Sequence, residues 1–381
     1  MKHSRILRFF LRIAIASIIA LLTIAIIEMI LRLQESFIPN PWEKQANFFE
    51  QCNGYRRMRP NLALTVWNGI SLFTDQNGFR ISSPRKSQDI IGKHSILLLG
   101  DSFSMGWRVR ADETFGELMA KQLGCILYNA SCYGLDAQEE ANLLMDILES
   151  DTHDVFRSLK PRPTLIVWQL FGNDIIPASV LPARTAERPD TLIRPTPVKE
   201  YLRTHLFRKT WPLLSVTIKR VLLKIGLIQP ITPEQNPTYA LAQWGGLYPP
   251  KNYPQAWKNF REIFKEVVAK LQKQGIKLAV LVIPYESQVS EEYRKEIFRQ
   301  LLLKIPSELA QATHFQNEIQ LLGAHYSIII VDPLAALKIA DHQNHTYIKY
   351  DYHLTPYGHQ VVARSLIQTI QPPVTDTTSH K

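Results

Sequence analysis

Residues 95–107 read SILLLGDSFSMGW, in which four apolar residues, Ile96–Leu99, stop abruptly at Gly100-Asp101-Ser102. A short apolar run that ends at a turn signal is typical of a strand buried on both faces, as in parallel sheets. In open α/β sheets, ligands bind at the carboxyl ends of such strands. The hydroxyl of Ser102 is therefore a candidate functional group.

The rest of the chain repeats this pattern. With 381 residues and 45% apolar composition it can bury a full core, which excludes a disordered or fibrous protein. Five short apolar runs occupy residues 95–99, 125–128, 164–170, 277–283 and 326–331, and helical spacing is present in 114–123, 136–148, 254–274 and 307–322. This alternation predicts an α/β fold with a five-stranded parallel sheet covered on both faces.

Basic residues precede an apolar run, Ile13–Leu31, near the start of the chain. At ~1.5 Å per residue, the run approaches the ~30 Å hydrocarbon core of a membrane. A cleaved signal peptide is the alternative, but its apolar region is shorter and ends at small residues, unlike Glu28–Leu31 here. We predict that residues 1–34 form a cytoplasmic basic tail and a transmembrane anchor, with the rest outside the cytoplasm.

The remaining chain divides into a connector over 35–74, a main domain over 75–372 with an insertion at 177–252, and a flexible tail over 373–381. Within the insertion, apolar residues recur at helical intervals over 210–226 and predict a basic amphipathic helix. Such a helix could cover the site as a lid, lie on lipid headgroups, or simply dock on the domain.

The formal net charge of +10 is unevenly distributed. Four basic residues lie in the amino-terminal tail, and Val198–Gly226 holds seven basic residues against one acidic residue, so the remainder sums to zero. This distribution favours contact with an anionic membrane surface, and we expect no nucleic-acid partner.

The three cysteines, Cys52, Cys125 and Cys132, follow no metal-binding spacing. Cys125 and Cys132 flank a predicted strand, and seven extended residues cover roughly 23 Å, beyond disulfide reach. We predict buried apolar thiols.

A serine hydroxyl becomes a nucleophile when a base accepts its proton and an acid orients that base. The stretch YDYHLTPYGH, residues 350–359, supplies Asp351 and His353 on one loop before a predicted helix. The alternatives are a metal site formed by Asp351, His353 and His359, or a lone pair of histidines in a surface loop.

Two further strand ends carry groups that could donate hydrogen bonds to an oxyanion. YNASCYG ends at Gly134, where the backbone can approach a ligand closely, and FGND places Asn173 directly after a buried run. Taken singly, Gly134 could be an ordinary turn and Asn173-Asp174 a helix cap. Their occurrence at successive strand ends favours a site.

Together, GDS with Ser102, NASCYG with Gly134, FGND with Asn173 and DYHLTPYGH with His353 resemble the four blocks of the SGNH, or GDSL-like, hydrolase superfamily. The resemblance covers roughly residues 75–370. It implies a three-layer α/β/α sandwich and an ester hydrolase without a cofactor. Its roles would be Ser102 as nucleophile, His353 as base and Asp351 as partner of the base, with the Ser102 N–H, Gly134 N–H and Asn173 amide as oxyanion donors.

Three other stretches, NGFR, WRVRADETF and VLVIPYESQV, resemble a membrane-anchored bacterial branch of that superfamily, which implies a domain facing the periplasm. Two features depart from the family pattern. Phe171 stands where the third block usually has glycine, and Asp351 precedes His353 by two residues rather than three. The G-x-S-x-G elbow of the α/β-hydrolases is absent.

We therefore predict a membrane-anchored serine hydrolase that removes acyl groups from a small molecule, a glycan or a lipid. One alternative is an O-acyltransferase of cell-surface polysaccharide, which would pass the acyl group to a sugar hydroxyl. Another is a non-catalytic scaffold in glycan export.

Overall fold

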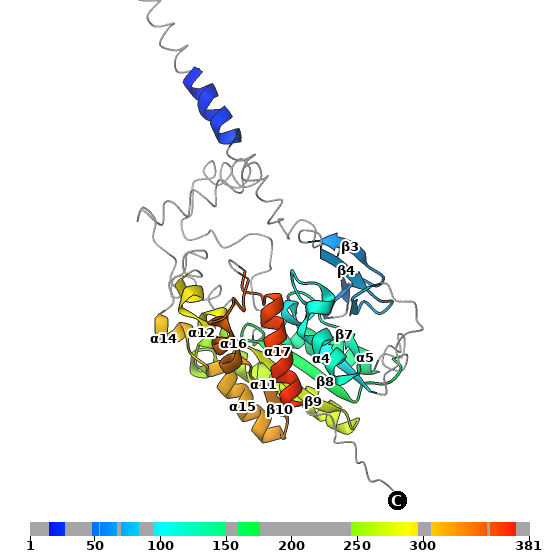
Figure 1. Ribbon diagram of the computed structural model, residues 1–381. Helices are drawn as coiled ribbons and strands as arrows, with labels where there is room; N and C mark the ends of the chain where they lie inside the picture. Colours follow the sequence, from blue (N-terminus) through cyan, green and yellow to red (C-terminus); the bar gives the residue numbers. More distant parts are fainter. Residues whose placement is uncertain are drawn as a thin grey trace, which may run out of the picture. The chain divides into compact units, whose positions relative to one another are not determined.

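The computed structural model describes residues 15–26, 48–52, 54–66, 70–83, 94–149, 159–175, 245–295, 306–348 and 351–370 (Figure 1). The chain divides into two compact units. One comprises Met1–Pro41 and Pro189–Pro230, and the other comprises Trp42–Arg188 and Ile231–Lys381. Every strand bounded below belongs to the second unit.

In the first unit, the described residues 15–26 are helical, and their apolar side chains are largely exposed. Within the described part of the chain, no helix has both the length and the hydropathy needed to cross a membrane, so the predicted transmembrane helix is not found there. The other residues of the predicted anchor lie outside the described residues. So do the basic helix predicted at 210–226 and the tail at 373–381.

A mixed sheet of eight strands forms the centre of the second unit. In spatial order these are β10 (Ile329–Val331), β9 (Lys277–Ile283), β8 (Leu165–Phe171), β6 (Ser95–Leu99), β7 (Ile126–Asn129), β5 (Arg80–Ile81), β4 (Ile70–Thr74) and β3 (Ala63–Val66). The first five are parallel to one another and confirm the five predicted strands. The sheet is larger than predicted, because β5, β4 and β3 extend it with antiparallel pairs.

The described part of the predicted connector also contains a separate antiparallel hairpin, β1 (Phe49–Cys52) and β2 (Tyr55–Met58). These amino-terminal strands have four or five residues each and are only half-buried in places. Short strands at a sheet edge carry weak apolar signals, which explains why the sequence did not reveal them.

Side chains of the central strands alternate between two apolar clusters, one on each face of the sheet. Leu97 and Leu99 belong to one cluster, and Ile96 and Leu98 belong to the other. The first cluster contains residues of α5 (Ala137–Glu149), α11 (Pro254–Lys273) and α15 (His314–Tyr326). The second contains residues of α4 (Phe115–Leu123), α16 (Leu334–Asp341) and α17 (Pro356–Thr369). The architecture is thus the predicted three layers, with helices on both faces of the sheet (Figure 1).

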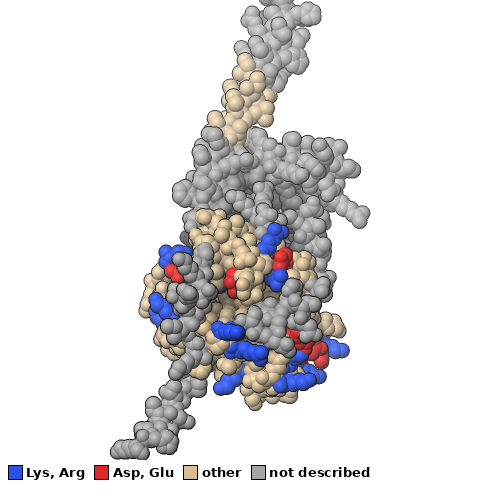
Figure 2. All heavy atoms as spheres, turned by 90° about the vertical axis from the view of Figure 1, so that its right-hand side faces the viewer, with Lys and Arg blue, Asp and Glu red and all other residues tan. Residues whose placement is uncertain are grey.

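Short elements connect these layers. They are α3 (Ser102–Met105), η1 (Ala111–Glu113), η3 (Gly245–Leu247), η4 (Pro250–Asn252), α12 (Glu286–Val289) and α14 (Ser307–Ala310). On the face shown in Figure 2, Lys and Arg side chains lie among Asp and Glu side chains. All three cysteines are free; Cys132 is buried, whereas Cys52 and Cys125 are only partly buried.

The parallel strands run in the spatial order second, first, third, fourth, fifth along the chain. The order reverses between β6 and β8, the strands that precede Ser102 and Asn173. Loops diverge at such a switch point and leave a crevice at the carboxyl ends of the strands.

Candidate active site

Gly100 terminates β6 in a conformation that excludes a side chain. Its φ is +157°, and a Cβ atom there would lie 2.6 Å from Gln169 Oε1 and 2.7 Å from Ser104 Oγ. Gln169 Oε1 accepts hydrogen bonds from the N–H of Asp101, the N–H of Ser104 and the hydroxyl of Ser104. The turn after β6 is therefore tied to the neighbouring strand β8.

Asp101 starts the short helix α3. Its carboxylate caps the helix by accepting the N–H of Phe103 at 2.9 Å, which places Ser102 in the first turn. The Ser102 residue is only 4% exposed. The GDS motif thus forms a strand-to-helix turn that presents a serine at the switch point of the sheet.

His353 and Asp351 approach Ser102 from a distant part of the chain. His353 Nε2 lies 2.8 Å from Ser102 Oγ, and His353 Nδ1 lies 2.5 Å from Asp351 Oδ1. An ionised carboxylate only accepts hydrogen bonds, so Nδ1 carries the proton and Nε2 is free to accept one from Ser102. This arrangement can remove a proton from the serine hydroxyl.

The loop that carries His353 is closed on itself. Ile348 N–H donates to His353 O, Asp351 N–H donates to Ile348 O, and Tyr347 forms a β-bridge with Leu354. Helix α17 follows at once, because the Thr355 side chain caps it by accepting the N–H of Gly358. These local bonds hold Asp351 and His353 within one compact loop.

The carboxylate of Asp351 contacts the imidazole of His353 and the guanidinium of Arg108. Burial would raise its pKa, but the contacts with His353 and Arg108 outweigh burial and lower the pKa to about 2. Asp351 is therefore ionised at neutral pH. The imidazole of His353 stacks on Tyr352 with ring centroids 4.6 Å apart, which restricts its rotation.

The metal-site alternative does not fit this geometry. Both nitrogens of His353 face Ser102 and Asp351, and His359 Nδ1 accepts the N–H of Phe115 at 3.2 Å. Among the residues described, no cluster of histidine, cysteine and acidic side chains could hold a metal ion.

Gly134 and Asn173 lie on loops that meet the Ser102 turn. Cys132 N–H donates to Gly100 O at 3.1 Å, and Ala137 N–H donates to Asp174 O at 3.3 Å, so the loop after β7 joins the other two. Gly134 has φ +70°, a left-handed conformation that favours glycine.

The side chain of Asn173 is partly buried. Its Oδ1 atom is buried and has no hydrogen-bond partner among the described residues. The next residue, Asp174, caps the turn by accepting the N–H of Phe171 at 2.6 Å. The geometry therefore brings Ser102, His353 and Asp351 into direct contact, and brings the loops of Gly134 and Asn173 alongside them.

Two arginines at the site were not anticipated from the sequence. Arg108 Nη1 donates to Asp351 Oδ2 at 3.2 Å. Arg56, on β2, donates to Gly134 O and forms an ion pair with Glu139 at 2.7 Å. Arg108 lies in the WRVRADETF stretch, but no signal marked Arg56, because its partners are about eighty residues away in sequence.

A buried carboxyl group lies among the acidic residues behind the site. Glu140 on α5 is 0% exposed; its Oε2 accepts the N–H of Trp168 at 2.7 Å, while Oε1 has no hydrogen-bond partner among the described residues. Burial, followed by the charges of Asp174 and Asp101, raises the pKa of Glu140 well above its ordinary value.

Glu140→Gln should raise the melting temperature, and the gain should grow from pH 5 to pH 8. The raised pKa means that the folded protein retains a proton that the unfolded chain releases, so this group lowers the free energy of unfolding as pH rises. Glutamine keeps an oxygen that accepts the N–H of Trp168, and it has no carboxyl group whose ionisation would destabilise the folded protein. Thermal unfolding at both pH values measures the effect, with Glu262→Gln, a 61% exposed site, as the control. If the melting temperatures of wild type and Glu140→Gln change by the same amount between pH 5 and pH 8, the raised pKa of Glu140 is contradicted.

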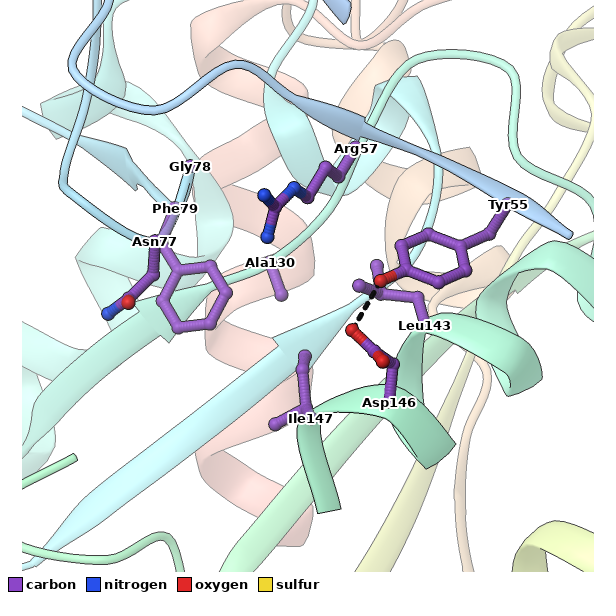
Figure 3. A pocket seen from close by; sticks show the side chains of 9 residues that line it. All are labelled: Tyr55, Arg57, Asn77, Gly78, Phe79, Ala130, Leu143, Asp146 and Ile147. Carbon is purple, nitrogen blue, oxygen red and sulfur yellow. Dashed lines mark hydrogen bonds between the residues drawn. The ribbon is translucent and has the colours of Figure 1, made fainter. Parts of the chain in front are cut away.

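A pocket lies apart from Ser102, His353 and Asp351, the three residues of the proposed catalytic triad (Figure 3). Its lining comes from β2, the turn before β5, the residue after β7, and α5. It consists of Tyr55, Arg57, Asn77, Gly78, Phe79, Ala130, Leu143, Asp146 and Ile147. Tyr55 donates to Asp146 Oδ2 at 2.5 Å across its floor. Since Ser102 and His353 do not line it, this pocket is not the place where an acyl group would react.

Residues 244–380 match the family described as SGNH hydrolase-like domain, acetyltransferase AlgX. The matched part includes Asp351 and His353, whereas Ser102, Gly134 and Asn173 precede it. A comparison with curated proteins gives no match.

Solved structures similar to this chain include a lipolytic protein of the G-D-S-L family from Veillonella parvula, with 11% identity and a TM-score of 0.38, covering 74% of this chain and 100% of that chain. A catalytic mutant of Axe2, an acetylxylan esterase from Geobacillus stearothermophilus, has 11% identity and a TM-score of 0.38 over 74% of this chain and 97% of its own. The esterase EstA from a Pseudoalteromonas species has 13% identity and a TM-score of 0.37, covering 73% of this chain and 96% of that chain.

Proposed function

We propose that the chain is a serine hydrolase of the SGNH type, which cleaves esters or removes O-acyl groups through an acyl-enzyme on Ser102. The match of residues 244–380 to an SGNH hydrolase-like domain supports this proposal. The observation that carries the proposal is the chain of contacts from Ser102 Oγ to His353 Nε2 and from His353 Nδ1 to Asp351. A nucleophile, a base and an orienting acid in this order are the requirements of acyl transfer through serine.

In the first half of the reaction, His353 Nε2 accepts the hydroxyl proton while Ser102 Oγ bonds to the acyl carbonyl carbon. The resulting oxyanion collapses, the bond to the leaving alcohol breaks, and the alcohol takes the proton from His353. In the second half, water attacks the acyl-enzyme and gives a proton to the same nitrogen. Collapse then releases the carboxylic acid and returns the proton to Ser102.

The oxyanion would accept hydrogen bonds from the Ser102 N–H, the Gly134 N–H and the Asn173 amide. Support comes from the loops that carry these groups, which contact one another at the carboxyl end of the sheet. The left-handed conformation of Gly134, and the bond from Arg56 to its carbonyl, hold that loop in a defined shape. Preorganised donors of this kind stabilise the transition state because they need not reorient during the reaction.

Asn173→Ala should lower kcat by roughly a hundredfold to a thousandfold with little change in KM, because the amide would act on the oxyanion and not on the ground state. Steady-state hydrolysis of p-nitrophenyl acetate measures both constants. Asn142→Ala is the control, since the Asn142 amide donates to Gly54 O, away from the site. Wild-type kcat in the Asn173→Ala protein would remove this residue from the proposed oxyanion site.

The proposal as a whole is tested with a fluorophosphonate probe, which forms a covalent bond with an activated serine. The wild-type protein should be labelled, and Ser102→Ala should not. Absence of labelling in folded wild-type protein would refute the hydrolase and leave the scaffold alternative. Labelling that persists in Ser102→Ala would assign the nucleophile elsewhere.

A second candidate is an O-acyltransferase, in which a sugar hydroxyl replaces water as the acyl acceptor. The match of residues 244–380 to a family that includes an acetyltransferase favours it. An acetyl donor supplied with and without a soluble glycan, followed by mass measurement of the products, separates the two. Acetylated glycan indicates transfer, whereas acetate at the same rate in both reactions indicates hydrolysis.

We further propose that the domain acts outside the cytoplasm on an acylated small molecule, glycan or lipid. The support is the distribution of basic residues at the start of the chain. An alkaline phosphatase fused to the carboxyl end should be active in cells, because that enzyme folds only after export. An inactive fusion that accumulates in the cytoplasm would contradict this location.

A further inference from the structure

The carboxylate of Asp351 is held from two sides. Its Oδ1 atom faces His353 Nδ1 at 2.5 Å, and its Oδ2 atom accepts a hydrogen bond from Arg108 Nη1 at 3.2 Å. The two side chains of the ion pair are mostly buried, with 22% of Arg108 and 14% of Asp351 exposed. Partly buried charges are screened less by solvent than surface pairs are. Arg108 can therefore restrict rotation of the Asp351 carboxylate.

Arg108 adopts an unfavourable backbone conformation in making this contact. Its φ is +60°, in the left-handed region that costs free energy for any residue with a Cβ atom. Glycine would occupy the same position without that cost. A strained residue persists only where its surroundings impose the conformation.

Arg80 imposes this conformation from the interior of the domain. This arginine, from the NGFR stretch, is 2% exposed and lies beneath the loop. Its guanidinium donates to the carbonyl oxygens of Met105, Gly106 and Val109, which flank Arg108 on both sides. A buried cation is costly unless hydrogen bonds compensate it, so the bonds from Nη1 and Nη2 tie the loop to Arg80, whereas its Nε has no partner among the described residues.

Building on the proposed function, we propose that Arg108 is a positioning residue: it fixes the carboxylate of Asp351 so that Oδ1 stays bonded to His353, while buried Arg80 holds the loop that carries Arg108. Arg108 acts through Asp351 and contacts no reacting atom. The arrangement explains how an acid only two residues before the histidine keeps its alignment in a short loop.

Other ionisable groups near the Asp351–His353 pair do not replace this cation. Burial raises the pKa of Glu286, on α12, to about 8 and lowers the pKa of His359, on α17, to about 3, so both are neutral near pH 7. Burial also raises the pKa of Asp101, before α3, to about 6. These groups are common to wild type and variants, so a difference between the proteins reports on Arg108.

Arg108→Gly tests the proposal most sharply, because it removes the guanidinium and relieves the backbone strain together. The expected result is a melting temperature no lower than wild type, with kcat reduced about tenfold, as for loss of one charged hydrogen bond, and KM little changed. The acid limb of the kcat/KM profile should move to higher pH, because loss of a nearby cation makes the imidazole easier to protonate. Arg108→Lys should recover part of kcat.

Arg110→Ala is the matched control. Arg110 lies two residues later on the same loop, is 63% exposed, and pairs with Asp112 and Glu113 at the surface. Its loss should leave kcat and the pH profile unchanged. The proposal is overturned if Arg108→Gly keeps the wild-type kcat and pH profile. It is equally overturned if Arg108→Lys and Arg108→Gly are impaired alike with an unshifted acid limb.

Proton NMR separates this proposal from the proposed function. The proton between His353 Nδ1 and Asp351 should give a low-field signal, which needs no substrate. In Arg108→Gly this signal should shift or broaden, and in Arg110→Ala it should not. If wild type is inactive towards esters while the signal responds to Arg108, the hydrolase proposal fails and the positioning role stands. If Ser102-dependent hydrolysis is present but the signal is unaffected, the positioning role fails alone.

Discussion

Ser102→Ala should lower kcat/KM for ester hydrolysis by about 10⁴-fold or more, with almost no change in the free energy of unfolding. The alanine protein lacks the atom that would form the acyl-enzyme, and residual activity would come only from binding and the oxyanion donors. The lost hydrogen bond to His353 contributes only modestly to stability, because His353 Nδ1 remains bonded to Asp351. Steady-state kinetics and thermal unfolding of the same preparations measure the two quantities.

Ser104 provides a matched control two residues away on α3. It is fully buried, and its hydroxyl donates to Gln169 Oε1 at 2.8 Å, within the turn and away from His353. Ser104→Ala should cost about 1 kcal/mol of stability and keep most of the activity. An equal loss of activity in Ser104→Ala and Ser102→Ala would indicate that the turn, and not a nucleophile, had been disturbed.

Asp351→Asn should reduce kcat by about 10³- to 10⁴-fold. An asparagine amide can donate to Nδ1, which stabilises the tautomer with the proton on Nε2, and that tautomer cannot accept the serine proton. The substitution also removes the negative charge that stabilises the imidazolium formed during the reaction. The pH dependence of kcat and the extent of fluorophosphonate labelling measure the loss.

Asp341→Asn is the control for this change of carboxylate to amide. Asp341 Oδ1 accepts hydrogen bonds from the N–H and hydroxyl of Thr346 and from the hydroxyl of Tyr293, all outside the triad. Its substitution should lower the melting temperature more than it lowers kcat. Asp351→Asn with wild-type kcat would show that Asp351 does not orient the base, and that its two-residue spacing reflects a different role.

Local sequence signals predicted the parallel strands well. β6 and β9 have the predicted bounds, Ser95–Leu99 and Lys277–Ile283, because each begins at a polar residue, continues as an apolar run and stops before Gly100 or Pro284. β10 begins at Ile329, three residues later than predicted, since helix α15 continues through Tyr326. The antiparallel strands were missed, because a four-residue edge strand such as β3 has little apolar pattern and is stabilised mainly by its neighbours.

The candidate site divides in the same way. Ser102, Gly134, Asn173 and His353 stand beside recognisable turns or strand ends, so their residue types and positions pointed to chemistry before any geometry was known. Arg108, Arg56 and Glu140 do not stand at a strand end or a recognisable turn signal, so the sequence did not single them out. Each is defined by a partner far away in sequence: Asp351 is 243 residues from Arg108, and Glu139 is 83 residues from Arg56.

The sequence by itself determined the elements that depend on neighbouring residues: buried strands, the glycine and aspartate that turn the chain after β6, and the polar groups at strand ends. Only the tertiary structure decided which of those groups touch, because Ser102 and His353 are 251 residues apart and meet through packing of the whole sheet. It also decided where buried charges such as Arg80 find their acceptors. The physical reason is range: turns and apolar runs are stabilised locally, whereas alignment of a proton-transfer chain depends on contacts that form when distant segments pack together.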